Sequence, residues 1–276
     1  MAGRTQERRV AGRLGSFGLA LLVSAIGADT ARAGAWVLPE GSGQAIATVG
    51  ASSATSRYDA DGGERASARF DKTEANLLLE YGLTDRVTVK ARVEGERLSF
   101  EDKPNENRAG LGFSEAGARV RLLQRGGFVG SVESSVRIGL ADDVPGVDAD
   151  GRRILSEYEA RLLAGYGFEV VGYESFVNAE AAYRLRDGIG ADEVRVDLTL
   201  GTRPKDRLLV LLQSFSAIGL ERPEAEILGH ESHKLQASGV YDLTNAVAVQ
   251  GGGFTSIAGR DSLAETGAFA ALWYRF

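Results

Sequence analysis

The most informative stretch of the chain is TGAFAALWYRF, at residues 266–276. Every second residue counted back from the end of this stretch is apolar, and the row consists of Phe276, Tyr274, Leu272, Ala270 and Ala268. Because successive side chains of a strand point to opposite faces, the stretch predicts an extended strand with one apolar face. Such a strand fits two folds. In a membrane barrel the apolar row contacts lipid, and in a soluble sandwich it contacts the core.

The first 33 residues have the three parts of a secretory signal peptide. Four arginines precede an apolar run at residues 14–27, and the small-x-small triplet at residues 31–33 supplies a cleavage site. The run is shorter than the roughly 20 residues that a membrane-spanning helix needs. We therefore predict that residues 1–33 are a signal peptide that is removed on export.

The composition excludes several classes of protein. The chain has 38 acidic and 32 basic residues and a net charge of −6 at pH 7, so we expect no nucleic-acid partner. It has no cysteine, which fits a periplasmic or outer-membrane protein that avoids accidental disulfides. The chain has 36 glycines, 5 prolines and many short alternations of apolar and polar residues, and this pattern does not predict a helical protein.

Alternation of apolar and polar residues predicts twelve strands. They lie at residues 44–57, 70–81, 87–98, 113–123, 128–140, 154–166, 173–186, 192–202, 208–218, 233–241, 247–257 and 266–276. Short turns and long polar loops alternate between them, with every short turn on the side of the two chain ends. This is typical of an all-β, transmembrane, antiparallel up-and-down β-barrel, here over residues 34–276 with a periplasmic lead-in at residues 34–43. The strand boundaries leave ten or fourteen strands open.

The charged residues of most strands keep to one face. At residues 87–98, Lys90, Arg92 and Glu94 share one face and the other face is apolar. Lys or Arg on the lipid face of a barrel costs about 2–4 kcal/mol at mid-bilayer, so a bilayer would impose this segregation. Residues 208–212 are apolar on both faces, so the alternation does not predict which of their two rows faces lipid. The charged rows are predicted to line the interior, at Lys90, Arg92, Glu94, Glu115, Arg119, Arg121, Glu133, Arg137, Glu157, Glu159, Arg161, Glu180, Arg195 and Asp197.

Several turn and strand motifs resemble those of a known group of proteins. They are GAWVLPEGSGQ at residues 34–44, EYGLTDRVTV at 80–89, DEVRVDLTLGTRP at 192–204, LLQSFS at 211–216 and the terminal aromatic residue. The chain thereby resembles uncharacterised porin-like outer-membrane barrels of Gram-negative bacteria, loosely similar to the transporters named after the meta-pathway of phenol degradation. The resemblance implies an insertion signal at Phe276, Tyr274 and Leu272 that the barrel-insertion machinery reads, and contact with outer-membrane lipid and lipopolysaccharide. It specifies no ligand.

Two states of the barrel interior are compatible with these rows. Charged side chains facing one another can line a narrow polar pore for small polar or amphipathic solutes, or they can pair across strands and plug the barrel. The first hypothesis predicts a passive channel with no catalytic residue, no metal and no cofactor. The second leaves a structural or adhesive barrel whose acidic outer loops contact cations or lipopolysaccharide.

A membrane-embedded enzyme, such as a lipid hydrolase, deacylase or protease, is the remaining alternative. Its only histidines would be His230 and His233, within the sequence His-Glu-Ser-His. His230 and Ser232 are two residues apart and would project to the same side of a strand. The spacing is not the His-Glu-x-x-His pattern of a zinc site, and no Gly-x-Ser-x-Gly elbow occurs. Two polar histidines in a loop are the simpler interpretation.

Overall fold

The computed structural model describes residues 34–104, 107–139, 156–187, 191–220 and 230–276. The predicted signal peptide at residues 1–33 lies outside this part of the chain, as do parts of several outer loops. Among the described residues, no helix is long and apolar enough to cross a membrane.

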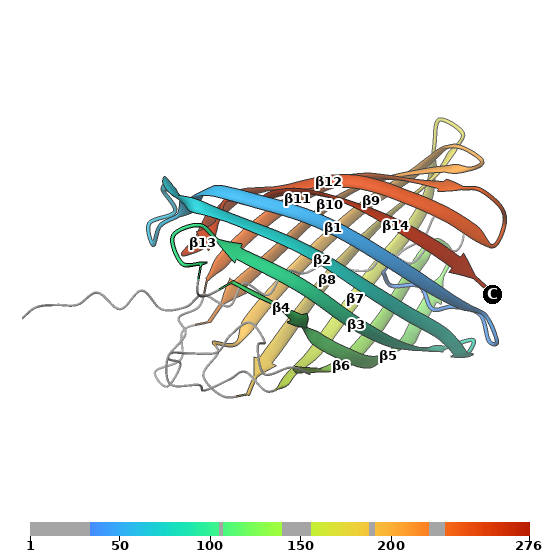
Figure 1. Cartoon of the computed structure of the whole chain (residues 1–276). Coiled ribbons are helices and arrows are strands. Elements are labelled where there is room, and N and C mark those ends of the chain that lie inside the picture. Colours follow the sequence, from blue (N-terminus) through green and yellow to red (C-terminus); the bar gives the residue numbers. More distant parts are fainter. Residues whose placement is uncertain (1–33, 105–106, 140–155, 188–190, 221–229) are drawn as a thin grey trace, which may run out of the picture.

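All regular elements of the described chain are strands of one antiparallel sheet (Figure 1). Their bounds are β1 Gly43–Tyr58, β2 Glu64–Thr84, β3 Val87–Phe100, β4 Arg108–Leu111, β5 Phe113–Arg125, β6 Phe128–Gly139, β7 Ser156–Val170, β8 Tyr173–Arg186, β9 Glu193–Lys205, β10 Leu208–Gly219, β11 Glu231–Asp242, β12 Val247–Arg260, β13 Ser262–Leu263 and β14 Thr266–Arg275. Apart from the short strands β4 and β13, each strand pairs with the next one along the chain, and β1 pairs with both β2 and β14. The sheet is therefore a closed barrel.

The fourteen labelled strands make twelve passes through the wall. β4 and β5 both pair with β3 and are separated only at Gly112, so they form one pass. β13 and β14 both pair with β1 and form the last pass in the same way. The predicted twelve-strand barrel is confirmed, and the terminal stretch at residues 266–276 is the strand that closes it.

Short turns gather at one end of the barrel, which we call the turn end, and the longer connections lie at the other, the loop end (Figure 1). The C-terminus lies at the turn end. The main difference from the prediction is β2, which begins at Glu64 and not near residue 70. Residues 64 and 65 are charged and the sequence predicts a loop here, yet residues 64–66 pair with residues 56–58 of β1 and extend this hairpin.

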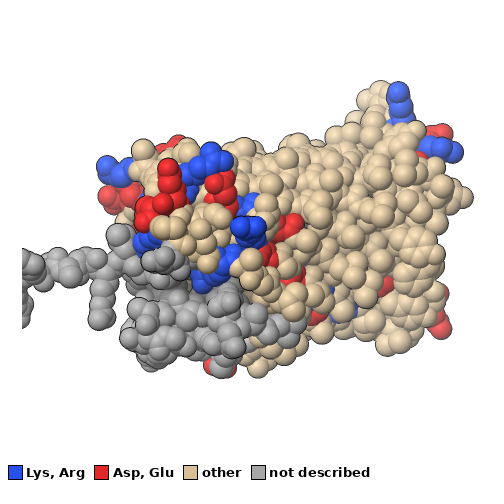
Figure 2. Space-filling model, in the orientation of Figure 1, with Lys and Arg blue, Asp and Glu red and all other residues tan. Residues whose placement is uncertain are grey.

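The two faces of the wall differ as the alternation predicts. On β9, Val196, Leu198 and Leu200 are exposed, whereas Arg195 and Asp197 between them are buried. The face of the barrel drawn in Figure 2 has a wide, almost charge-free belt between charged side chains at its two ends, with more of them at the loop end. The exposed rows are therefore the apolar rows, as lipid contact requires.

Strand β10, whose lipid-facing row the sequence left undecided, is settled by its packing. Leu209 and Leu211 are buried and point inward, and Val210 and Leu212 are exposed. The inward leucines join an apolar cluster inside the barrel with Ile46, Leu78, Phe176, Val240, Ala248, Ala271 and Trp273. The interior is thus apolar at this place, which explains why β10 is apolar on both faces.

A lysine on the outward face should impair insertion. Leu198 is 48% exposed near the middle of β9, and we expect Leu198→Lys to cost about 2–4 kcal/mol near mid-bilayer. The measurement is the fraction of refolded protein in lipid vesicles that keeps the heat-modifiable mobility of a folded barrel. Val171→Lys is the matched control because Val171 is 89% exposed in the turn between β7 and β8, outside the apolar belt. Equal folded fractions for the two variants would contradict a lipid-facing β9.

Candidate functional site

Ion pairs link the inward rows of neighbouring strands near the loop end. The register sets Glu115, Arg137, Glu157 and Arg186 side by side on β5 to β8, and opposite charges across a strand pair stabilise it. Arg137 forms an ion pair with Glu157. Arg186 Nε lies 2.9 Å from Glu157 Oε1, and its Nη2 lies 2.5 Å from Glu193 Oε1. We call these five residues the loop-end ladder.

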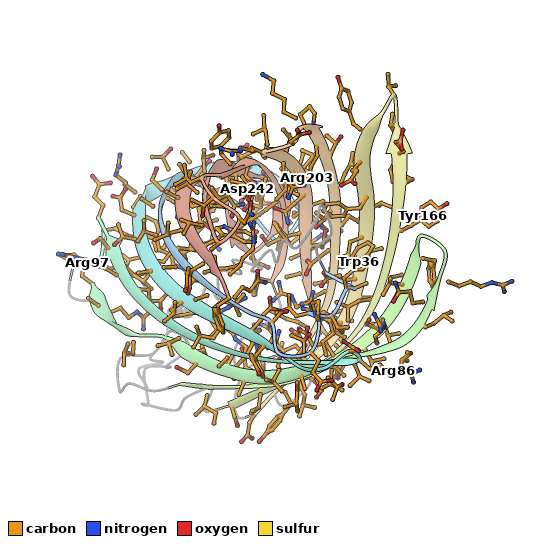
Figure 3. The ribbon with its side chains drawn as sticks, turned by 90° about the vertical axis from the view of Figure 1, so that its right-hand side faces the viewer. Trp36, Arg86, Arg97, Tyr166, Arg203 and Asp242 are labelled. Atoms are coloured by element: carbon orange, nitrogen blue, oxygen red, sulfur yellow. The ribbon has the colours of Figure 1, made fainter. Side chains whose placement is uncertain are left out.

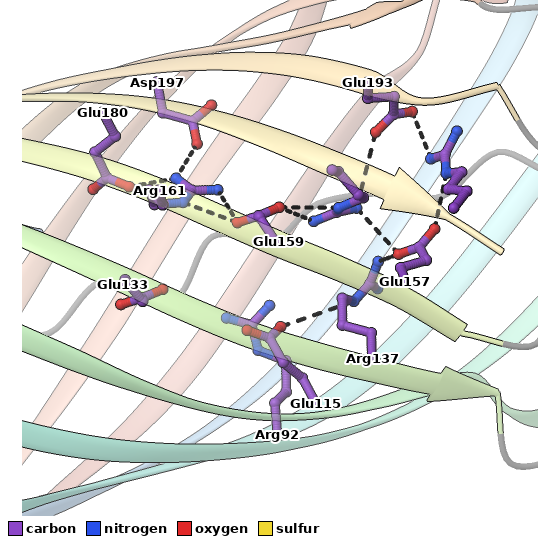
Figure 4. Close-up of polar contacts among 12 residues, drawn as sticks. Arg92, Glu115, Glu133, Arg137, Glu157, Glu159, Arg161, Glu180, Glu193 and Asp197 are labelled. Atoms are coloured by element: carbon purple, nitrogen blue, oxygen red, sulfur yellow. Dashed lines mark hydrogen bonds and ion pairs between the residues drawn. The ribbon is translucent and has the colours of Figure 1, made fainter. Parts of the chain in front are cut away.

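A second set of pairs adjoins the loop-end ladder on β7, β8 and β9 (Figure 4). Arg184 donates to Glu159 Oε2 from Nε at 2.9 Å and from Nη2 at 2.6 Å. Arg161 Nε donates to Glu159 Oε1 at 3.0 Å. Arg161 Nη1 lies 2.7 Å from Asp197 Oδ2 and also pairs with Glu180. Glu159 therefore joins two arginines on neighbouring strands, and no carboxylate of this set lacks a cation.

The pairs continue onto β2, β3, β5 and β6. Lys90 Nζ lies 2.5 Å from Glu133 Oε1 and 2.7 Å from Glu115 Oε1. Arg119 Nη2 lies 2.8 Å from Glu133 Oε2 and 3.5 Å from Glu80 Oε1. An unpaired buried ion costs several kcal/mol, so these charges stabilise the barrel only as a connected set. Together they make one side of the interior a charged wall from β2 to β9.

The opposite side of the interior has fewer charged side chains and carries several amide side chains. Gln236 Nε2 on β11 donates to Gln213 Oε1 on β10 at 2.9 Å. Gln250 Nε2 on β12 donates to Ser238 Oγ at 3.0 Å, and Trp273 Nε1 donates to Gln250 Oε1 at 3.1 Å. The interior therefore offers a charged wall on β2 to β9 and a wall of glutamines on β10 to β14, where Lys234 Nζ and Glu265 Oε2 form an ion pair at 2.6 Å.

The structure places the fourteen predicted interior residues on inward rows. Twelve of them take part in ion pairs: Lys90, Arg92, Glu94, Glu115, Arg119, Glu133, Arg137, Glu157, Glu159, Arg161, Glu180 and Asp197. Arg121 is only partly buried and has no ion pair with a described residue, although it lies opposite the inward Ser131. Arg195 is buried, and its Nε and Nη1 have no hydrogen-bond partner among the described residues. Arg184, Arg186 and Glu193, which the alternation assigns to the same charged rows, are also buried on this face.

The lead-in predicted to lie outside the barrel enters it instead. In the N-terminal segment, residues 34–42, the amide of Ala35 donates to Asn178 Oδ1 at 2.9 Å, and Ser131 Oγ donates to the Ala35 carbonyl at 2.5 Å. Arg119 Nη1 donates to the Trp36 carbonyl at 3.1 Å. Ala35 is fully buried. The prediction was wrong because these contacts join residues far apart in the sequence, which alternation along one strand cannot reveal.

Trp36 anchors the N-terminal segment inside the barrel, as the view from the turn end shows (Figure 3). Its ring meets Phe176 edge to face, with centroids 5.9 Å apart. A Cβ at Gly165 on β7 would lie 2.4 Å from the Trp36 ring, so only glycine leaves room for the indole there. Leu38 adds a backbone hydrogen bond to Thr88 Oγ1 at 2.8 Å. The segment therefore narrows the interior by contacts with several strands.

A cavity of about 710 Å³ lies at the turn end. It is lined by the turns between β7 and β8, β9 and β10, and β11 and β12, together with Arg275. Asp242 accepts from Arg203 at 3.0 Å and from Arg275 at 2.9 Å, and both Arg203 and Asp242 lie at this end in Figure 3. The turn end is thus hollowed and polar.

The two histidines lie on different faces. His230 Nε2 is 3.7 Å from Glu193 Oε1 of the loop-end ladder, and burial lowers the pKa of this imidazole below its usual value. His233 lies on β11, where Nδ1 is 2.9 Å from Ser216 Oγ and Nε2 is 2.8 Å from Glu231 Oε1. The sequence suggested Ser232 as a partner for His230, whereas the structure pairs His233 with a serine of another strand.

Comparison with known proteins shows similarity in fold. No family model matches the chain, and no curated protein matches its sequence. Among solved structures, the COG4313 outer-membrane channel from Pseudomonas putida F1 is similar with a TM-score of 0.69 and 14% identity, covering 88% of this chain and 98% of that one. The KdgM porin has a TM-score of 0.51 and 9% identity over 83% of this chain and 99% of its own. The NanC porin has a TM-score of 0.51 and 6% identity over 83% and 98%. At these sequence identities the structural overlap shows the fold alone, which is a closed antiparallel β-barrel.

Proposed function

We propose that this protein is an outer-membrane channel for the passive passage of small polar or amphipathic solutes. The observation that carries the proposal is the division of the barrel wall into an apolar outward face and a charged inward face. A barrel that served only as an anchor would not require charges along its interior, whereas selectivity in a pore comes from such charged side chains. The wall of glutamines beside the charged wall suits solutes that have both a polar and a less polar part.

The N-terminal segment fits this function as the constriction of the channel. It contacts β3, β5, β6 and β8 through Thr88, Arg119, Ser131 and Asn178, and so reaches across the interior. Paired charges and this segment together make the pathway narrow. A plugged barrel and a pore then differ in whether the paired charges and this segment leave a continuous opening.

Export and insertion belong to the same proposal. Residues 1–33 would direct secretion, and the barrel-insertion machinery would recognise Leu272, Tyr274 and Phe276. All three side chains are exposed on the outward face, and the rings of Tyr274 and Phe276 stack with centroids 5.8 Å apart. The partners are then outer-membrane lipid and lipopolysaccharide.

Single-channel recording tests the proposal. The mature chain, refolded from detergent into a planar bilayer, should give stable conductance steps. The double variant Arg119→Gln/Arg121→Gln should shift the reversal potential in a salt gradient toward cation selectivity, because it removes two inward positive charges. Arg86→Gln/Arg125→Gln is the control, since Arg86 and Arg125 are exposed in turn-end positions. A folded, inserted barrel without conductance steps would contradict a channel.

A further inference from the structure

Three polar side chains near the loop end form a hydrogen-bonded chain outside the barrel interior. Ser216 on β10 and His233 on β11 are directly opposite in the register, and Ser216 Oγ lies 2.9 Å from His233 Nδ1. Glu231, two residues before His233 on the same strand, places Oε1 2.8 Å from His233 Nε2. The sequence order of the three residues gives no sign of this contact. A serine that contacts a histidine, which in turn contacts a carboxylate, is the arrangement in which an oriented base activates a nucleophilic hydroxyl.

The alternation of β10 and β11 places this chain of contacts on the outward face. Phe215 and Ala217 are buried, so Ser216 between them belongs to the outward row with Leu212 and Ile218. His233 belongs to the outward row of β11 with Leu235. The side chain of His233 is 25% exposed and that of Glu231 is 30% exposed. The barrel wall therefore separates these residues from the charged interior, and their chemistry is independent of a channel.

We propose that Ser216, His233 and Glu231 form an esterase site that acts on acyl esters of amphiphiles in the outer leaflet. The assignment to the outer leaflet rests on the outer-membrane location proposed above, but the esterase chemistry does not depend on the channel function. Glu231 accepts the hydrogen bond of Nε2–H and so fixes the tautomer in which Nδ1 is unprotonated. Nδ1 is then the atom that accepts the hydroxyl proton of Ser216.

The reaction follows from these contacts. Ser216 Oγ attacks the ester carbonyl carbon while its proton passes to His233 Nδ1. The ester C–O bond then breaks, and the leaving alcohol takes the proton from His233, which leaves an acyl group on Ser216. A water molecule, deprotonated by His233, attacks this acyl ester, releases the carboxylic acid and returns the proton to Ser216. Water is the only co-reactant.

The surroundings of Ser216 indicate an amphiphilic ester. Val196 lies opposite Ser216 on β9 and is exposed, as are Ile218 and Leu235, so an acyl chain finds apolar surface beside the hydroxyl. Arg260 Nε lies 3.4 Å from Glu231 Oε2 and its side chain is 65% exposed. This cation suits an anionic headgroup. The ester carbonyl would thus lie where the apolar belt meets the charged rim.

The sheet also sets the expected rate. Residues on both sides of Ser216 pair with β9 and β11. The nearby backbone amides therefore donate to carbonyls of the neighbouring strands, and no pair of them is left to bind an oxyanion. One such donor is worth roughly 10²–10³ in kcat in enzymes that have it. The site should therefore be slow, and covalent capture of the serine is a sharper probe than turnover.

An alkyl fluorophosphonate, which phosphonylates activated serines, is the probe. The mature chain refolded in detergent micelles is incubated with it, and the adduct is located by peptide mass spectrometry. We expect one adduct on Ser216, labelling at least about 100-fold slower in His233→Asn, as loss of a general base implies, and slower labelling in Glu231→Gln. Ser214→Ala is the matched control, because Ser214 lies in the same outward row opposite Leu235. It should leave the adduct unchanged. Slow hydrolysis of p-nitrophenyl decanoate, abolished by Ser216→Ala, should accompany labelling.

Two results would overturn the esterase proposal. One is a folded barrel in which Ser216 is labelled no faster than Ser214, and the other is labelling of Ser216 that His233→Asn does not slow. Heat-modifiable mobility of each variant confirms that the barrel is folded. Conductance of Ser216→Ala should equal that of the parent, because Ser216 faces away from the interior. Loss of the esterase and loss of the channel are therefore separate outcomes.

Discussion

A barrel without residues 34–42 should conduct several times more current than the full mature chain. The N-terminal segment fixes Ala35 between Asn178 and Ser131 and holds Trp36 against Phe176, so its removal opens the interior beside β6 to β8. Pore conductance rises with the cross-section of the narrowest part. Single-channel recording of the truncated chain in a planar bilayer, at the same salt concentration, measures the change.

Gly165→Val offers the same test without a deletion. A Cβ at residue 165 would lie 2.4 Å from the Trp36 ring, which must move away from β7. We therefore expect larger conductance steps, with more frequent changes between levels because the displaced segment stays attached. Gly251→Val is the control, since a Cβ at Gly251 on β12 meets no atom within 4 Å. Unchanged steps in both the truncated chain and Gly165→Val, each folded by heat-modifiable mobility, would show that the segment does not limit the current.

Properties that depend on a single strand could be predicted from the sequence. The two-residue period fixes which side chains share a face, and the contrast between Val196 outside and Arg195 inside follows from it. Because lipid excludes charged side chains from the outward face, the same two-residue period also predicts which charged residues lie in the interior. The closure of the barrel by residues 266–276 followed from the even number of strands and the parity of the loops.

Contacts between distant parts of the chain could not be predicted in this way. Trp36 rests against Phe176 and Gly165, more than a hundred residues away in the sequence, and its apolar character alone did not distinguish a lead-in from an inserted segment. Ser216 and His233 meet only because β10 and β11 pair in one register. A shift of one residue would turn one of the two side chains to the other face and break the contact. Such sites depend on register, which a single sequence does not fix.

Arg137→Met should destabilise the barrel by about 3–5 kcal/mol, the usual cost of removing one partner of a buried ion pair. Arg137 pairs with Glu157 and lies 3.5 Å from Glu94 Oε2 and 3.8 Å from Glu115 Oε2. Its removal leaves three carboxylates facing one another with one cation fewer. Urea unfolding of the refolded protein in lipid vesicles, followed by tryptophan fluorescence, gives the free energy of unfolding.

The cause of this loss can be separated from the loss of packing. Arg121→Met makes the same change at an inward arginine that has no ion pair with a described residue, so it should cost less than about 1 kcal/mol. The double variant Arg137→Met/Glu157→Gln should be more stable than the sum of the two single changes predicts, by about 0.5–3 kcal/mol, because the second change removes a carboxylate that the first left under-compensated. Strict additivity would mean that the pair contributes no coupling and that the charged wall stabilises the barrel by packing alone. A measured coupling would instead show that the charges of the interior also stabilise the pairing of β6 with β7. A substitution at Arg137 that alters ion selectivity would then also lower the stability of the barrel.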